Sequence, residues 1–171
     1  MKTLKLKVSL GLLAALLLMS VVSASGRDLH AMWDDRCATC HGHSGEFSRR
    51  VLSVSNAELQ GRHHIHDLRL FLTNHYLSGH SVEPVYNMLL AQASSKPRFK
   101  DECSKCHQSA AEFSRKSLIL RDGELYDRSS DIPIRDFLSS HRKLQPGDVD
   151  YFLQQLIRVT REVNAEDGTS K

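Results

Sequence analysis

Two short stretches of this sequence repeat one arrangement of cysteine and histidine. In each, two cysteines are separated by two residues and a histidine follows the second cysteine directly: Cys37, Cys40 and His41, then Cys103, Cys106 and His107. Thiolate and imidazole groups bind metals and react as nucleophiles, so both stretches are candidates for chemistry. The spacing within them indicates which chemistry.

The C-x-x-C-H spacing is typical of covalent haem attachment. Two intervening residues let both thiols reach the vinyl groups on one edge of a porphyrin, and the next residue is turned under the ring, where its imidazole can bind iron. A four-thiolate zinc site and a thioredoxin-like redox centre also use paired cysteines, but two copies that both end in histidine favour haem. We therefore expect two covalently bound haem c groups, attached through Cys37, Cys40, Cys103 and Cys106, with His41 and His107 as axial ligands of iron.

The two halves resemble each other well beyond the motifs. At an offset of 66 residues they align without a gap from Cys37/Cys103 to His75/His141, and both carry EFSR shortly after the motif. An internal repeat of this length indicates two structural units of one kind. We predict one haem module over residues 25–93 and a second over residues 94–171, joined at a small polar stretch that ends in Pro97.

The second half indicates the other axial ligand by elimination. From Pro97 to the end there is no methionine, and the only histidines are His107 and His141. His141 is therefore the remaining strong ligand, and the repeat pairs it with His75. We predict bis-histidine coordination, His41 with His75 and His107 with His141. Met88 competes with His75 in the first half, but it falls in an apolar helical stripe, which favours core packing.

Other conspicuous residues have two interpretations. The repeated arginines could pair with haem propionates or could be ordinary surface residues: Arg49/Arg115 and Arg62/Arg128. The histidine-rich stretch HHIH, residues 63–66, resembles a metal-binding tract, but we interpret it as a solvated loop.

The elements that must position these groups are predicted to be helices. Apolar residues at helical spacing mark a helix before the first motif (26–33) and two amphipathic helices after the distal histidines, from Ser81 to Gln92 and from Pro146 to about Val163. Residues 53–61 and 119–128 are expected to be short, irregular segments that can include a small β-turn. The predicted fold class is all-α. Each half is small for a core of its own, so haem should complete the core and the chain without haem should be largely unfolded.

The first 24 residues have the anatomy of a secretory signal peptide. Three lysines precede an uncharged apolar run, and small residues lie before a cleavage point after Ala24. An uncleaved anchor is the alternative, although the run of about fifteen residues is short for a membrane span. The mature chain, Ser25–Lys171, has 20 basic and 20 acidic residues. We expect a periplasmic protein that binds no nucleic acid and is not stably inserted in a membrane.

With these features the chain resembles a class I c-type cytochrome in duplicate. The resemblance rests on the aromatic Trp33, on CATCHG from Cys37 to Gly42, and on final helices that close at Gln92 and near Val163. It implies two class I cytochrome c-like modules in tandem, each with a final helix packed across its leading helix, and a role as an electron carrier in a bacterial periplasm. The chain departs from the family at the distal ligand, which is normally methionine and here is expected to be histidine.

The function expected from these observations is that of an exported dihaem c-type cytochrome, a low-potential electron-transfer shuttle rather than an enzyme. Histidine in place of methionine lowers the reduction potential, and filled axial positions leave no site for substrate on the iron. Redox proteins of the periplasm are the expected partners. The alternatives are a peroxidase-like or sulfur-compound-oxidising haem enzyme, a haem sensor, or an electron-transfer subunit of a larger oxidoreductase.

Overall fold

The computed structural model of the chain describes residues 27–62, 67–77, 79–141 and 144–165. It is mostly helical, with two short antiparallel hairpins. The predicted signal peptide, residues 1–24, and the HHIH stretch lie outside the described residues. None of the helices in the described part of the chain is long and apolar enough to cross a membrane.

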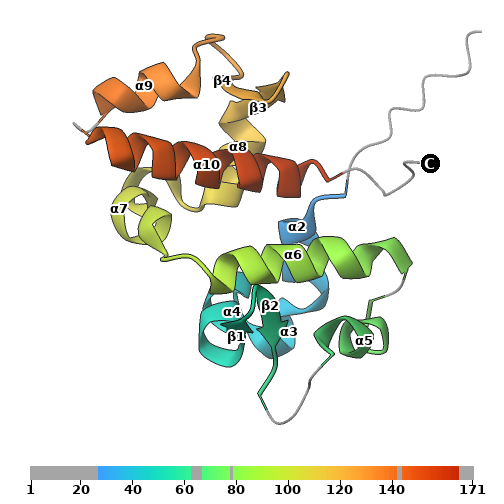
Figure 1. The fold of residues 1–171 in the computed structure, drawn as a ribbon. Coiled ribbons are helices and arrows are strands. Elements are labelled where there is room, and N and C mark those ends of the chain that lie inside the picture. The colour runs from blue at the N-terminus through green and yellow to red at the C-terminus, as the bar shows by residue number, and fades with distance from the viewer. Residues whose placement is uncertain (1–26, 63–66, 78, 142–143, 166–171) are drawn as a thin grey trace, which may run out of the picture.

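The N-terminal half runs from residue 27 to residue 93 and forms the lower part of Figure 1. Its elements in chain order are α2 (Leu29–Arg36), α3 (Ala38–His41), α4 (Ser44–Val51), β1 (Ser53–Ser55), β2 (Glu58–Gln60), α5 (Leu68–Thr73), the 3-10 turn η1 (Gly79–Ser81) and α6 (Val82–Ala93). The longest, α6, packs against α4, α5, α2 and both strands.

The C-terminal half forms the upper part of Figure 1 and follows a connection of residues 94–97. Its elements are α7 (Arg98–His107), α8 (Ala110–Ser117), β3 (Leu118–Arg121), β4 (Glu124–Asp127), α9 (Ile134–Ser140) and α10 (Pro146–Val163). Here α10 has the place that α6 has in the other half, because it packs against α8, α9 and both strands.

The mostly helical structure is compatible with the predicted all-α class, but residues 53–61 and 119–128 are more regular than expected. These segments form the hairpins β1–β2 and β3–β4, which pair Val54 with Leu59 and Leu120 with Leu125. The residues at each tip, Asn56-Ala57 and Asp122-Gly123, all have positive φ. That backbone conformation is the one that matches a two-residue hairpin turn to the twist of its strands.

The two amphipathic helices after the distal histidines are confirmed as α6 and α10. Their predicted apolar faces are buried apart from Leu90 and Ile157, which are half-buried. Neither Ser81 before α6 nor Gln145 before α10 makes a side-chain capping bond. Pro146 instead occupies the first turn of α10, where its missing N–H costs nothing.

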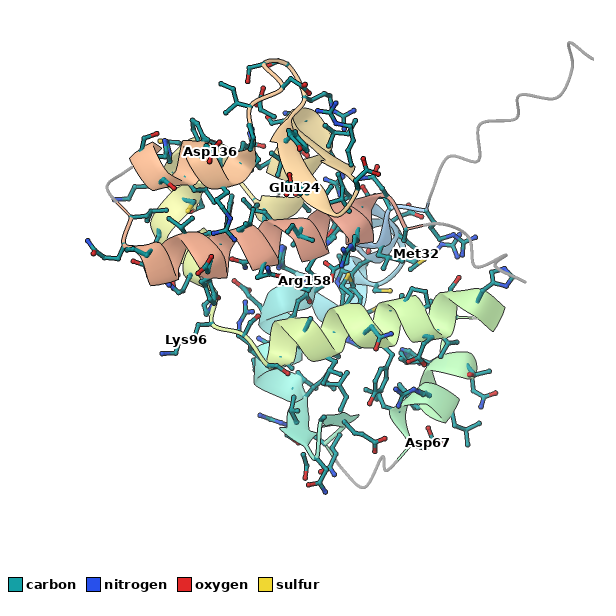
Figure 2. The ribbon with its side chains drawn as sticks, turned by 45° about the horizontal axis from the view of Figure 1, so that its top comes forward. Met32, Asp67, Lys96, Glu124, Asp136 and Arg158 are labelled. Carbon is teal, nitrogen blue, oxygen red and sulfur yellow. The ribbon has the colours of Figure 1, made fainter. Side chains whose placement is uncertain are left out.

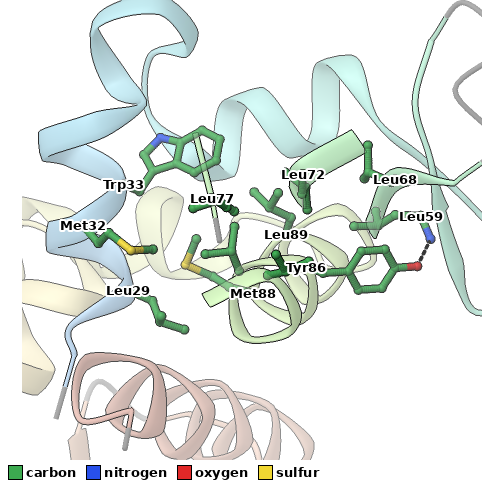
Figure 3. Packing of buried hydrophobic residues seen from close by; sticks show 12 residues of the cluster. Leu29, Met32, Trp33, Leu59, Leu68, Leu72, Leu77, Tyr86, Met88 and Leu89 are labelled. Carbon is green, nitrogen blue, oxygen red and sulfur yellow. Dashed lines mark hydrogen bonds between the residues drawn. The ribbon is translucent and has the colours of Figure 1, made fainter. Parts of the chain in front are cut away.

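Tyr86 is central to the core of the N-terminal half (Figure 3). It is 1% exposed, and its hydroxyl accepts a hydrogen bond of 2.8 Å from the backbone N–H of Leu59 on β2. This bond ties the hairpin to α6. The corresponding residue of the second half, at an offset of 66, is Phe152, which has no hydroxyl.

Tyr86→Phe is expected to lower the free energy of unfolding by about 1–3 kcal/mol, because it leaves the buried N–H of Leu59 without a partner. Chemical denaturation of the mature protein measures the change. Tyr151→Phe is the matched control: its hydroxyl donates to the carbonyl of Lys96 at an exposed site, so its loss should cost less. Equal effects of the two substitutions would contradict this account of Tyr86.

The two halves are held together by polar contacts between α2 and the C-terminal half. Arg115 on α8 pairs with Asp28, which caps α2. Burial raises the pKa of Asp28, but hydrogen bonds from Arg115 and from the backbone at Ala31 outweigh it, so the net pKa is below the ordinary value. On α10, Glu162 lies 2.8 Å from Nε2 of His30, and both side chains are buried.

Candidate functional site

The two C-x-x-C-H motifs lie on helical segments that end at the histidine. In the first half the helix is interrupted at Cys37, and α3 supplies the rest of the motif. In the second half α7 carries the whole motif without a break. The next residue has positive φ in both cases, Gly42 at 70° and Gln108 at 54°. The chain therefore turns away directly after His41 and His107.

The structure brings each motif histidine to the distal histidine that the repeat assigned to it. The ring centroids of His41 and His75 lie 5.9 Å apart, and those of His107 and His141 lie 6.1 Å apart. The angle between ring planes is 62° in both pairs. These distal histidines follow α5 and α9, so the same elements position the pair in each half.

The separation within each pair is compatible with one metal ion bound between the two rings. A metal-bound imidazole nitrogen lies about 2.0–2.1 Å from the metal, and the ring centroid lies roughly 1 Å further out, which gives on the order of 6 Å between two centroids across one ion.

Aromatic rings hold the motif histidines. Phe47 on α4 contacts the His41 ring at a centroid distance of 4.7 Å, and Phe113 on α8 contacts His107 at 4.5 Å. Behind them lie Trp33 and Phe99, which occupy equivalent positions in the two halves. Only the first half adds a polar restraint, because Nε1 of Trp33 donates a 2.9 Å hydrogen bond to the carbonyl of Gly42.

Aromatic rings also fix the distal histidines. Phe71 stacks on His75 with centroids 4.8 Å apart, and Phe137 stacks on His141 at 4.6 Å. Both phenylalanines are large apolar side chains left about two-fifths exposed, at 39% and 40%. Apolar faces beside two imidazoles are suited to a large apolar ligand that would cover them.

The electrostatic surroundings favour the neutral form of the motif histidines. Burial lowers the pKa of His41, and the nearby imidazole of His75 lowers it further. The pKa of His107 is lowered by burial and by His141 in the same way. Neutral imidazole is the form that binds metal ions, since protonation removes the lone pair.

A cavity of about 640 Å³ opens between the histidines of the second half. The cysteines Cys103 and Cys106 and the imidazoles of His107 and His141 line it, and its other walls are largely apolar, with Phe113 among them. Its volume is in the range of pockets that hold cofactors. The combination of two thiols, two facing imidazoles and apolar walls fits a haem c attached through the thiols.

The thiols are available for attachment. None of the four cysteines forms a disulfide; Cys40 and Cys106 are exposed, and Cys37 and Cys103 are half-buried. Among the described residues no group of three or more His, Cys, Asp or Glu side chains is arranged to hold a bare metal ion.

Met88, the rival ligand of the first half, lies in the core. It is 1% exposed and packs in the same cluster as Leu29 and Met32 (Figure 3). The interpretation of Met88 as a packing residue is confirmed, and Met32 is also buried in this cluster. His43, which aligns with Ser109 in the repeat, caps α4 by accepting a 3.2 Å hydrogen bond from the N–H of Gly45.

The repeated arginines bond to protein groups. Arg62 and Arg128 each donate to a backbone carbonyl of their own half, at 2.6 and 2.8 Å. Arg49 donates to the carbonyl of Gln92 at 3.3 Å, and Arg115 pairs with acidic side chains. These bonds brace the fold, and contact with haem propionates stays a prediction.

The comparisons with known proteins found no match to this chain. No protein-family model matches the chain, and neither a curated protein nor a solved structure matches it.

Proposed function

We propose that this protein is an exported dihaem c-type cytochrome that carries electrons between redox proteins of the periplasm. The observation that carries the proposal is the pair of equivalent sites, in which a C-x-x-C-H histidine faces a second imidazole at a centroid distance of 5.9 or 6.1 Å. The repeated order of helix, hairpin, distal histidine and long helix supports two modules of one kind, similar to class I cytochromes c, over residues 25–93 and 94–171.

Each protein group has a definite task in this proposal. Cys37 and Cys40, or Cys103 and Cys106, hold the porphyrin covalently, and the two imidazoles of each half hold its iron. When bound, haem supplies one-electron exchange between ferrous and ferric iron. The stacked rings of Phe71 and Phe137 keep the distal imidazoles in one orientation, which keeps the structural change on electron arrival small.

Two strong protein ligands at each site favour a carrier over an enzyme. A peroxidase or a gas sensor requires an axial position that is open or easily vacated, whereas here an imidazole is held on each side. Histidine as the second ligand places the potential below that of a histidine–methionine cytochrome. The polar contacts between α2 and the C-terminal half support a fixed relation between the two sites and hence exchange of electrons within one molecule.

Carbon monoxide tests the proposal on the dithionite-reduced mature protein. Because both axial positions are filled by tethered imidazoles, the visible spectrum is expected to stay unchanged when the gas is added. A large shift of the Soret band would contradict the carrier function and would favour a haem enzyme or sensor. The His141→Ala variant is the positive control, since it should bind carbon monoxide at one haem of the two.

A further inference from the structure

A second cavity of about 480 Å³ lies between the two halves. Its walls come from α2, α4 and α6 of the N-terminal half, from the connection, and from α7, α8 and α10. Figure 2 shows two of its residues, Lys96 on the connection and Arg158 on α10. None of the eight cysteines and histidines assigned to haem lines this cleft. Only Phe99 belongs to both cavities.

The charge of the cleft is basic. Four basic side chains and one carboxylate line it, the basic ones being Arg49, Lys96, Lys100 and Arg158. Glu46, the carboxylate, pairs with Lys100. Arg158 bonds at 2.5 Å to Glu162, whose other oxygen bonds to His30. Arg49 and Lys96 therefore carry the positive charge that the surrounding carboxylates do not balance.

The shape and the remaining walls point to more than a simple inorganic ion. The volume corresponds to about sixteen water molecules at roughly 30 Å³ each, much more than phosphate or sulfate fills. Apolar groups of Phe99, Ala111 and Val159 form part of the lining.

We propose that this cleft between the halves binds a small organic anion, with an oxyanion group near Arg49 and Lys96 and an apolar body against Phe99, Ala111 and Val159. The first turns of α4 and α8 reach the cleft through Gly45 and Ala110, and the positive ends of these helices add to the attraction for an anion. The site is independent of the proposed electron transfer, because no residue that holds haem takes part in it.

Titration calorimetry on the mature holoprotein at low ionic strength tests this proposal with three probes. Benzoate combines a carboxylate with an apolar body, inorganic phosphate supplies charge alone, and benzyl alcohol supplies the body alone. Benzoate is expected to bind with 1:1 stoichiometry and at least about tenfold more tightly than either of the other two.

Two substitutions in the cleft test whether benzoate binds there. Lys96→Gln and Arg49→Gln are each expected to weaken benzoate binding about tenfold, as the loss of a charge-assisted hydrogen bond does. Lys116→Gln is the matched control, because Lys116 is exposed on α8 outside the cleft lining. Lys96 is also exposed, so its variant should fold even where Arg49→Gln does not, and circular dichroism verifies the fold of each.

Four results would overturn the proposal: no benzoate binding at concentrations on the order of 10 mM, equal binding of benzoate and phosphate, equal binding of benzoate and benzyl alcohol, or an equal loss of affinity in Lys96→Gln and Lys116→Gln. Selective binding of benzoate that Lys96→Gln weakens and Lys116→Gln leaves unchanged would support it.

Discussion

Replacing Cys37, Cys40, Cys103 and Cys106 with alanine is expected to leave a chain that is largely unfolded. The reason lies in the cores of the two halves. Each half has its own cluster of buried apolar residues, one around Tyr86 and α6 and the other around Phe152 and α10. In the second half this cluster borders the cavity of about 640 Å³, since Phe152 and Leu156 belong to both.

The lining of that cavity explains the expected loss of structure. Without haem, its apolar side chains, Phe113, Ile134 and Leu138 among them, face water, and the free energy that their burial against haem would supply is lost. Halves of this length bury too little surface to compensate. Haem lost from both halves should therefore remove most of the helical structure.

Far-ultraviolet circular dichroism of the purified mature chain measures this effect. The fourfold variant should retain less than about half of the helical signal, and Cys103→Ala combined with Cys106→Ala should retain one haem and an intermediate signal. Ser104→Ala, a change on the same helix α7, is the control and should resemble the parent protein. A native-like helical spectrum of the fourfold variant would show that haem does not complete the core.

His141→Met is expected to raise the reduction potential of one haem by on the order of 100 mV and to leave the other unchanged. Thioether sulfur stabilises ferrous iron relative to imidazole, so the exchange of ligand shifts the potential upward. His141 is assigned by its position 6.1 Å from His107, between ring centroids, and by its stack on Phe137. Methionine is flexible enough to reach the same iron.

Potentiometric titration followed in the visible spectrum measures both haems. His75→Met is the matched variant and should shift the other haem. Met88→Leu is the control: Met88 is buried in the core, so its replacement should change neither potential. If His141→Met leaves both potentials and both spectra as in the parent protein, His141 is not a ligand.

The elements that the sequence predicts well are those with a periodic or repeated pattern. The apolar stripes that contain Val85 and Leu156 predict α6 and α10 because burial of one helical face leaves a period of 3.6 residues. The pairing of His107 with His141 follows from elimination in a half that has no other strong ligand. The repeat then transfers the assignment to His75. In the structure the ring centroids of the two pairs lie 5.9 and 6.1 Å apart, and their role as iron ligands stays a prediction.

The strands of the two hairpins are not predicted from the sequence, although a β-turn in these segments is allowed for and one of them carries a strong turn signal. Asp122-Gly123 is among the dipeptides most typical of a two-residue hairpin. The flanking strands have only three or four residues, and β1 is exposed along its whole length, so no alternation of apolar and polar residues marks it. Asn56-Ala57 carries no glycine, and only the repeat connects it with the second hairpin.

The contacts between the halves could not be predicted at all. Asp28 and Arg115 are 87 residues apart, and His30 and Glu162 are 132 residues apart. His30 and Glu162 meet because α2 packs against α10. Neither the periodicity of apolar residues nor the internal repeat predicts how separate helices pack. His30 in particular aligns with Lys96 in the repeat, so the duplication gave no indication of its partner.

Electron paramagnetic resonance of the oxidised mature protein tests most directly whether each half holds one iron between two imidazoles. Near-infrared magnetic circular dichroism of the same sample identifies the axial ligands. We predict two low-spin ferric haems per chain, both with bis-imidazole coordination. A high-spin signal, an axial sulfur ligand, or fewer than two covalently attached haems per chain would contradict the account.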